Sequence, residues 1–178
     1  MKKSLLFLIG LIILYSCAPD KPVELTKFGM TKEDSAAIIQ VVLDYQQAYE
    51  KEDFGGIIET LSKDVIIFGT DSAEVIKSLA DFKEQIRKQW ELYDKMKFGP
   101  MFDIFMQSDK MNTMASVVYG VPLDVTLRGQ DIHYFLRVAR TLKKENDKWV
   151  ISSGLMSITS TGQATTDLIQ QNQNLQQQ

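Results

Sequence analysis

An arginine and a group of aromatic residues are the side chains in this sequence best suited to hold a small molecule. Arg140 is the one charged residue at the alternating apolar positions between Tyr134 and Leu142. Five aromatic residues could accompany it in a cavity: Tyr45, Phe68, Trp90, Tyr119 and Tyr134. Their rings would supply apolar walls, and their hydroxyl and indole groups would orient a ligand. The alternative is that these aromatics are ordinary core residues.

Arg140 itself has two interpretations. A guanidinium stays charged at any ordinary pH, so a buried one requires an anionic partner. The partner is either the acidic group of a ligand or an internal carboxylate, for which Asp103 and Asp71 are the candidates. In the first case Arg140 anchors a ligand, and in the second it forms a structural ion pair.

Motifs for metal binding, cofactor binding and nucleophilic catalysis are absent from the sequence. The chain has one Cys and one His in 178 residues, so we expect no metal site, which needs three or four suitable ligands. No phosphate loop, nucleophile elbow or dinucleotide fingerprint occurs, and we expect no cofactor. We expect His133 at the surface or in an interface. An isomerase-like reaction would need a carboxylate base, for which Asp103 is the best candidate if it points inward.

The N-terminus has the layout of an export signal. Lys2 and Lys3 precede an apolar run from Leu5 to Leu14, which is too short for a comfortable membrane span. Leu14-Tyr15-Ser16-Cys17 then resembles the bacterial lipobox, whose Cys becomes the first mature residue and carries lipid. An uncleaved anchor helix is the alternative.

The lipobox resemblance implies a signal peptide over residues 1–16, lipidation at Cys17 and a tether over residues 17–30, stiffened by two prolines. Ala18 stands where Asp would imply retention at the inner membrane, so the resemblance favours the outer membrane, facing the periplasm. Loss of residues 1–16, with two Lys and no acid, would change the formal charge from −3 to −5. We therefore expect no nucleic-acid partner.

Helical periodicity fills the first part of the remaining chain, and strand periodicity fills the second. A capping box at Thr31–Asp34 begins the first helix. We predict helices over residues 31–49, 53–61 and 78–93, and strands over 65–68, 98–107, 112–127, 131–144 and 148–159. This order predicts an α+β fold with helices on one face of a curved sheet. The Gln/Asn-rich residues 161–178 are predicted to form a flexible tail.

The last predicted hairpin indicates which residues face the helices. If Asn146 and Asp147 form its turn, Leu155 lies opposite Val138 and Ser153 lies opposite Arg140. Alternation then places Tyr134, Leu136, Arg140 and Leu155 on the inner face, and His133, Phe135, Arg137 and Met156 on the outer one.

Several motifs, taken in order, resemble the SnoaL-like and ketosteroid-isomerase-like superfamily, also called nuclear transport factor 2-like. They are Tyr45 with Asp53, Leu61-Ser62-Lys63-Asp64, Phe68-Gly69-Thr70-Asp71, Ala115 to Tyr119, and Arg137 with Lys144 to Ile151. The match covers residues 34–158. It implies a domain over residues 31–160, shaped as a cone, with three N-terminal helices packed on a curved, mostly antiparallel sheet.

The same resemblance bears on function. Members of the superfamily hold a small molecule at the open end of the cone, and many form dimers. Arg140 resembles a pocket arginine of the association domain of calmodulin-dependent kinase. The closing strand typically carries a His six residues after its Trp, where this sequence has Leu155, which cannot transfer protons.

We therefore expect a membrane-tethered, non-catalytic domain that binds a small amphipathic, anionic molecule. Its cavity would be lined by Tyr45, Phe68, Trp90, Tyr119, Tyr134, Arg140 and Leu155. A lipid-anchored isomerase, dehydratase or cyclase, and a module that dimerises in the cell envelope, are the alternatives.

Overall fold

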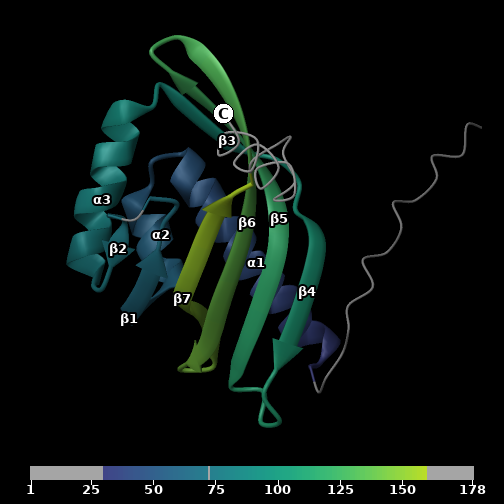
Figure 1. The fold of residues 1–178 in the computed structure, drawn as a ribbon. Coiled ribbons are helices and arrows are strands. Elements are labelled where there is room, and N and C mark those ends of the chain that lie inside the picture. The colour runs from purple at the N-terminus through teal and green to yellow at the C-terminus, as the bar shows by residue number, and fades with distance from the viewer. Residues whose placement is uncertain (1–29, 72, 160–178) are drawn as a thin grey trace, which may run out of the picture.

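The computed structural model describes residues 30–71 and 73–159, which form three helices and a seven-stranded sheet (Figure 1). The sheet order is β2-β1-β7-β6-β5-β3, with β4 also paired to β5. All pairings are antiparallel except that of β1 with β7. The predicted signal peptide, the lipidation site, nearly all of the tether and the tail lie outside the described residues.

The helices are α1 (Lys32–Glu50), α2 (Phe54–Thr60) and α3 (Leu79–Leu92). The strands are β1 (Leu61–Phe68), β2 (Val75–Ile76), β3 (Lys95–Phe98), β4 (Phe102–Ser108), β5 (Met114–Leu127), β6 (Gln130–Glu145) and β7 (Lys148–Ile158). None of the helices in the described part combines the length and apolar composition needed to cross a membrane.

Side-chain caps fix where the helices begin. The Thr31 hydroxyl accepts a hydrogen bond from the Asp34 N–H at 3.0 Å, and Ser78 caps α3 in the same way at Asp81. Each cap satisfies a backbone donor that has no partner inside the helix. The predicted starts of α1 and α3 are therefore confirmed.

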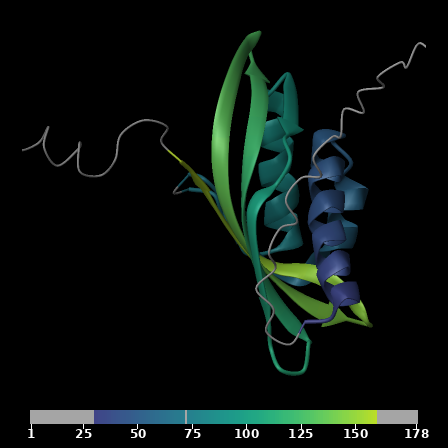
Figure 2. The same ribbon diagram turned by 90° about the vertical axis from the view of Figure 1, so that its right-hand side faces the viewer.

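The helices cover one face of the sheet, and no described helix covers the other (Figure 2). α1 lies across the concave face and buries Ile38, Val42 and Tyr45 against it. Inward residues of β5, β6 and β7, such as Val117 and Ile151, complete a continuous core. The predicted α+β cone, with three helices on a curved, mostly antiparallel sheet, is confirmed.

Two strand predictions were wrong. The predicted strand over 98–107 overlaps two strands, because β3 ends before Gly99-Pro100 and β4 begins after it. Proline fixes φ and has no N–H for the ladder, so it interrupts pairing there. The first strand begins at Leu61 rather than at 65, and the two-residue β2 was not predicted.

The predicted register of the β6–β7 hairpin holds only near its turn. Ile151 lies opposite Leu142, as predicted, but the register then shifts by one residue at a β-bulge around Ser152. The Ser152 hydroxyl donates to the Thr141 carbonyl at 3.1 Å. A one-residue shift exchanges the two faces of a strand.

The bulge therefore corrects the predicted faces of β7. Gly154, not Ser153, lies opposite Arg140, and Met156, not Leu155, lies opposite Val138. Leu155 is 54% exposed on the outer face.

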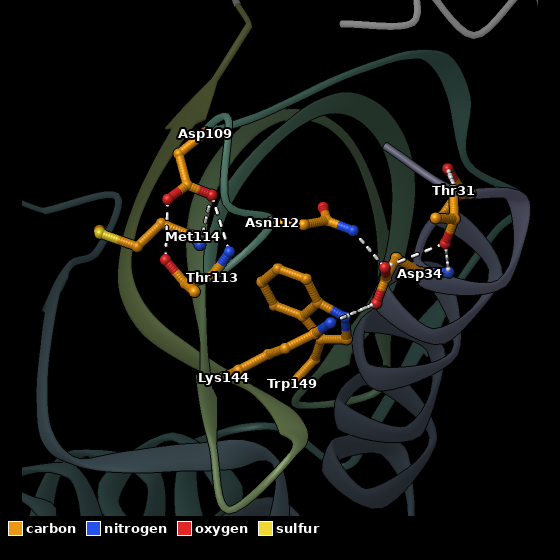
Figure 3. Close-up of polar contacts among 9 residues, drawn as sticks. Thr31, Asp34, Asp109, Asn112, Thr113, Met114, Lys144 and Trp149 are labelled. Carbon is orange, nitrogen blue, oxygen red and sulfur yellow. Dashed lines mark hydrogen bonds and ion pairs between the residues drawn. The ribbon is translucent and has the colours of Figure 1, made fainter. Parts of the chain in front are cut away.

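Polar contacts around Asp34 join three distant segments at one end of the cone (Figure 3). The Asp34 carboxylate accepts from the Trp149 indole N–H at 2.8 Å and the Lys144 ammonium at 2.8 Å. It also accepts from the Asn112 side chain in the β4–β5 turn. Hydrogen bonds from Lys144 and Trp149 lower the Asp34 pKa from 3.8 to about 2. The ionised carboxylate thus ties the start of α1 to both hairpin ends.

We predict that Asp34→Asn lowers the free energy of unfolding by about 2 kcal/mol at pH 7, because the amide loses the charge that these donors stabilise. The folded-state pKa is depressed, so this contribution is complete above about pH 5, decreases below the unfolded pKa of 3.8 and is largely lost as the pH falls toward 2. Urea denaturation at a series of pH values measures it. Asp44→Asn, on the exposed side of α1, is the control. A wild-type-to-mutant difference that does not shrink below pH 3 would contradict the assignment.

Candidate functional site

The described domain holds a cavity of about 110 Å³ between α1, α3 and the concave face of the sheet, beside β3. An adjoining hollow of about 30 Å³ shares five of its residues, including Tyr45 and Met156. The cavity lining is mostly aromatic and aliphatic, and comprises Tyr45, Tyr49, Thr70, Glu74, Gln89, Tyr93, Met96, Phe98, Leu123, Val125, Tyr134, Leu136, Met156 and Ile158. Apolar walls with a few polar groups are the usual composition of a ligand-binding pocket.

Arg140 lies beside this cavity but does not line it. Its side chain is buried, with 3% of the residue exposed, and its guanidinium carbon lies 4.3 Å from the centroid of the Tyr45 ring. Its Nε donates to the Tyr119 hydroxyl at 3.3 Å. Burial raises the pKa of Tyr45, while the Arg140 charge acts in the opposite direction.

No carboxylate in residues 30–71 and 73–159 forms an ion pair with Arg140. The predicted alternative of a structural pair with Asp103 or Asp71 is therefore wrong. The Nη1 atom of Arg140 is buried without a hydrogen-bond partner in the described part of the chain. It points at Gly154, where an added Cβ would lie 3.2 Å away. The absent side chain at Gly154 leaves the space that this part of the guanidinium occupies.

The seven predicted lining residues separate into three groups. Tyr45 and Tyr134 line the cavity. Trp90, Tyr119 and Arg140 lie behind its wall, where Trp90 packs edge-on against Tyr49 at 6.0 Å between ring centroids. Phe68 and Leu155 are on the outer face, 49% and 54% exposed, and lie opposite each other in the β1–β7 pair. The predicted place of both residues in the cavity was wrong. Leu155 faces outward because of the bulge in β7. Phe68 faces outward because it alternates in β1 with the buried Val65 and Ile67.

A chain of hydrogen bonds runs along one side of the cavity. The Tyr49 hydroxyl donates to Gln89 Oε1, and Gln89 Nε2 donates to Glu74 Oε1 at 2.9 Å. Burial raises the pKa of Tyr49 well above its usual value, so its hydroxyl remains a donor at ordinary pH. The three residues come from α1, α3 and the loop before β2.

The same loop fixes the second oxygen of Glu74. Oε2 accepts from the backbone N–H of Thr70 at 2.8 Å and of Asp71 at 3.1 Å. The Glu74 side chain passes so close to Gly69 that a Cβ there would lie 2.1 Å from Oε2. Gly69 is therefore required for this placement of the carboxylate.

Sequence reasoning missed the polar side of the cavity. Tyr49 lies four residues after Tyr45 on the same helical stripe, a spacing that could have identified it. Glu74 and Gln89 gave no comparable signal, because an acid in a turn and an amide on a charged helix are ordinary surface residues.

The other residues considered for chemistry lie outside the cavity. His133 is exposed and pairs with Asp124, as expected for a surface histidine. Asp103 is exposed beside a bulge in β4, with φ of 48°, and does not point inward. Within the described ranges, no three Cys, His or acidic residues are grouped to hold a metal ion.

Comparisons with known proteins identify the fold. No protein-family model matches the chain, and no curated protein sequence matches it. The chain does match solved structures. The chain is similar to hexachlorocyclohexane dehydrochlorinase LinA-type3 from Novosphingobium barchaimii LL02, with 11% identity and a TM-score of 0.65 over 72% of this chain and 88% of that one.

Two further structures agree. A ketosteroid isomerase-like protein from Erwinia carotovora atroseptica SCRI1043 has 16% identity and a TM-score of 0.62, over 73% of this chain and 99% of that one. An NTF2-like protein of unknown function from Pseudomonas putida KT2440 has the same identity and TM-score, over 72% and 89%. These likenesses show an NTF2-like fold, which confirms the predicted superfamily architecture.

Proposed function

We propose that this domain binds a small amphipathic molecule in the cavity beside Tyr45 without transforming it. The observation that carries the proposal is a mostly apolar cavity with a few polar groups, between the helices and the sheet of an NTF2-like fold. An apolar cavity of about 150 Å³ accepts a benzene ring, so a cavity of about 110 Å³ joined to a hollow of about 30 Å³ is close to the size for one small ring.

We further propose that the ligand carries an acidic group toward Tyr45. The Arg140 guanidinium cannot discharge and has no acidic partner among the described residues. It therefore places a positive potential at that end of the cavity. A carboxylate roughly 8 Å from it would gain about 2 kcal/mol at an effective dielectric constant of about 20.

We predict that 4-fluorobenzoate binds the full chain carrying Cys17→Ser, and that Arg140→Met weakens this binding about tenfold because the positive potential is lost. Met156→Trp should abolish binding, since a large ring would fill the cavity. Fluorine NMR titration measures both effects. Arg137→Met, on the exposed face of the same strand, is the control.

Thermal unfolding accompanies this titration. Because Arg140 has no ion-pair partner in the described domain, Arg140→Met should not lower the melting temperature. A large loss of stability, or equal binding by the Arg140 and Arg137 variants, would contradict the ligand-anchoring role.

We also propose that the protein is anchored through Cys17, at the outer membrane and facing the periplasm. The support is the sequence Leu14-Tyr15-Ser16-Cys17-Ala18. Several acyl chains hold a protein on a membrane, since each buried CH₂ contributes about 0.8 kcal/mol.

In a Gram-negative bacterium, we predict that Cys17→Ser abolishes incorporation of labelled palmitate and releases the chain from the outer-membrane fraction. Ala18→Asp should retain the lipid but move the protein to the inner membrane. Continued membrane attachment of the Cys17→Ser chain would indicate an uncleaved anchor helix instead.

A second proposed role is self-association through the uncovered face of the sheet. One row of paired residues crosses five strands there: Phe68, Leu155, Ala139, Val118 and Phe105. All but Ala139 are exposed apolar residues of substantial size. Such a patch is typical of an interaction surface. Asp103 and Arg137 line one hollow of this face, and their opposite charges suit the self-complementary surface of a two-fold dimer.

We predict that Phe105→Glu converts a homodimer into a monomer, because it buries unpaired charges near the two-fold axis. Light scattering after gel filtration of the full chain carrying Cys17→Ser measures the mass. Met111→Glu is the matched control, since Met111 is 79% exposed in the β4–β5 turn. A monomeric parent protein would refute the dimer.

The enzymatic alternative keeps one observation in its favour. The Glu74 carboxylate and the Tyr49 hydroxyl line the same cavity, which is the type of pair that isomerase chemistry uses. Against it, the described cavity has no histidine, and the candidate base Asp103 lies outside. Turnover of an enolisable ketone that stops in Glu74→Gln would favour this alternative over binding alone.

A further inference from the structure

The hydrogen bonds beside the cavity have a fixed direction. A carboxylate only accepts hydrogen bonds, so Gln89 must present its NH₂ group to Glu74. Its carbonyl oxygen is then turned to Tyr49, whose hydroxyl must donate. The Tyr49 hydroxyl and one of the two Gln89 N–H groups are therefore used, and the hydrogen bonds run from Tyr49 through Gln89 to Glu74.

The oxygen atoms of Glu74 and Tyr49 beside the cavity can still accept hydrogen bonds. Glu74 Oε2 is occupied by the Thr70 and Asp71 N–H groups and lies 3.4 Å from the Thr70 hydroxyl. Oε1 accepts only from Gln89 among the described residues, although a carboxylate oxygen can accept two hydrogen bonds. Tyr49 likewise keeps an oxygen that can accept. A ligand group that meets the Tyr49 oxygen or Glu74 Oε1 must supply a donor.

We propose that the cavity selects ligands that carry a hydroxyl group, which donates to Glu74 Oε1. The inference rests on the proposed binding function and adds a substrate class to it: an alcohol or phenol on a small apolar frame. A ligand with only acceptors at this position would leave two oxygens facing each other, which costs the binding energy of a hydrogen bond to a charged group.

The arrangement also predicts how selectivity can be reversed. In Glu74→Gln, the Thr70 and Asp71 N–H groups hold the amide oxygen in place of Oε2, so the NH₂ group replaces Oε1. Gln89 must then turn over to accept from that NH₂ group and donate to Tyr49. The Tyr49 hydroxyl becomes free to donate to the ligand, and the cavity changes from an acceptor site to a donor site.

The test uses fluorine NMR titrations of the full chain carrying Cys17→Ser with three ligands that share one fluorophenyl ring. These are 4-fluorophenol, which donates, 4-fluoroanisole, which cannot donate, and 4-fluoroacetophenone, which only accepts. We expect the phenol to bind about tenfold more tightly than the anisole. Glu74→Gln should remove that preference and favour the acetophenone. Glu84→Gln, an equivalent change on the exposed side of α3, should leave all affinities unchanged.

Gly69→Ala provides a second variant, because its added methyl group displaces the Glu74 carboxylate without changing a polar group. It should also remove the phenol preference. Equal binding of the phenol and the anisole to the parent chain, or a preference unchanged by Glu74→Gln, would overturn the inference alone. Failure of all three ligands and of 4-fluorobenzoate to bind would overturn the proposed function together with it.

Discussion

Which side chains of β7 line the cavity depends on one extra residue in that strand. The bulge around Ser152 shifts the β6–β7 register by one, and every side chain beyond it changes face. Gly154 and Met156 turn toward the helices, and Leu155 turns away. Without the bulge, Ser153 would lie against the Arg140 guanidinium, and Met156 would leave the cavity wall. The inner surface is thus specified by a local irregularity rather than by the alternation on either side of it.

The bulge in β7 places Gly154 opposite Arg140 and so makes room for the Arg140 side chain. A buried cation without an acidic partner is costly, and here the cost is reduced by the Tyr45 ring face and the Tyr119 hydroxyl. Cation–π contacts of this kind are worth roughly 1–2 kcal/mol when desolvated. Space for the guanidinium comes from the missing side chain at Gly154. The two ends of the domain differ accordingly. Asp34 accepts from four protein donors at one end, whereas Arg140 Nη1, near the cavity, has no hydrogen-bond partner among residues 30–71 and 73–159.

The elements could be predicted from the sequence because local signals agree with the fold. The caps at Thr31 and Ser78 and the helical stripe through Tyr45 gave the helices, and alternation gave β5, β6 and β7. Side-chain placement beyond a bulge could not be predicted, since Ser152 carries no local signal for one. Tyr45 and Tyr134 line the cavity, as the helical stripe of α1 and the alternation of β6 predicted. Glu74 was missed because its position depends on Gly69 and on backbone donors of its own loop.

The pairing of β1 with β7 has a consequence for the order of folding. These strands are parallel, and Ile66 lies beside Ser153 near the other end of the described domain. Contacts between residues so far apart in the chain are slow to form, because a long loop must close first. The helices and the β5–β6 hairpin can assemble from local contacts, but β1 has no neighbour on its inner side until β7 is in place. Among the described strands, β7 therefore completes both the sheet and the wall around Met156, so a chain truncated before β7 would lack that wall.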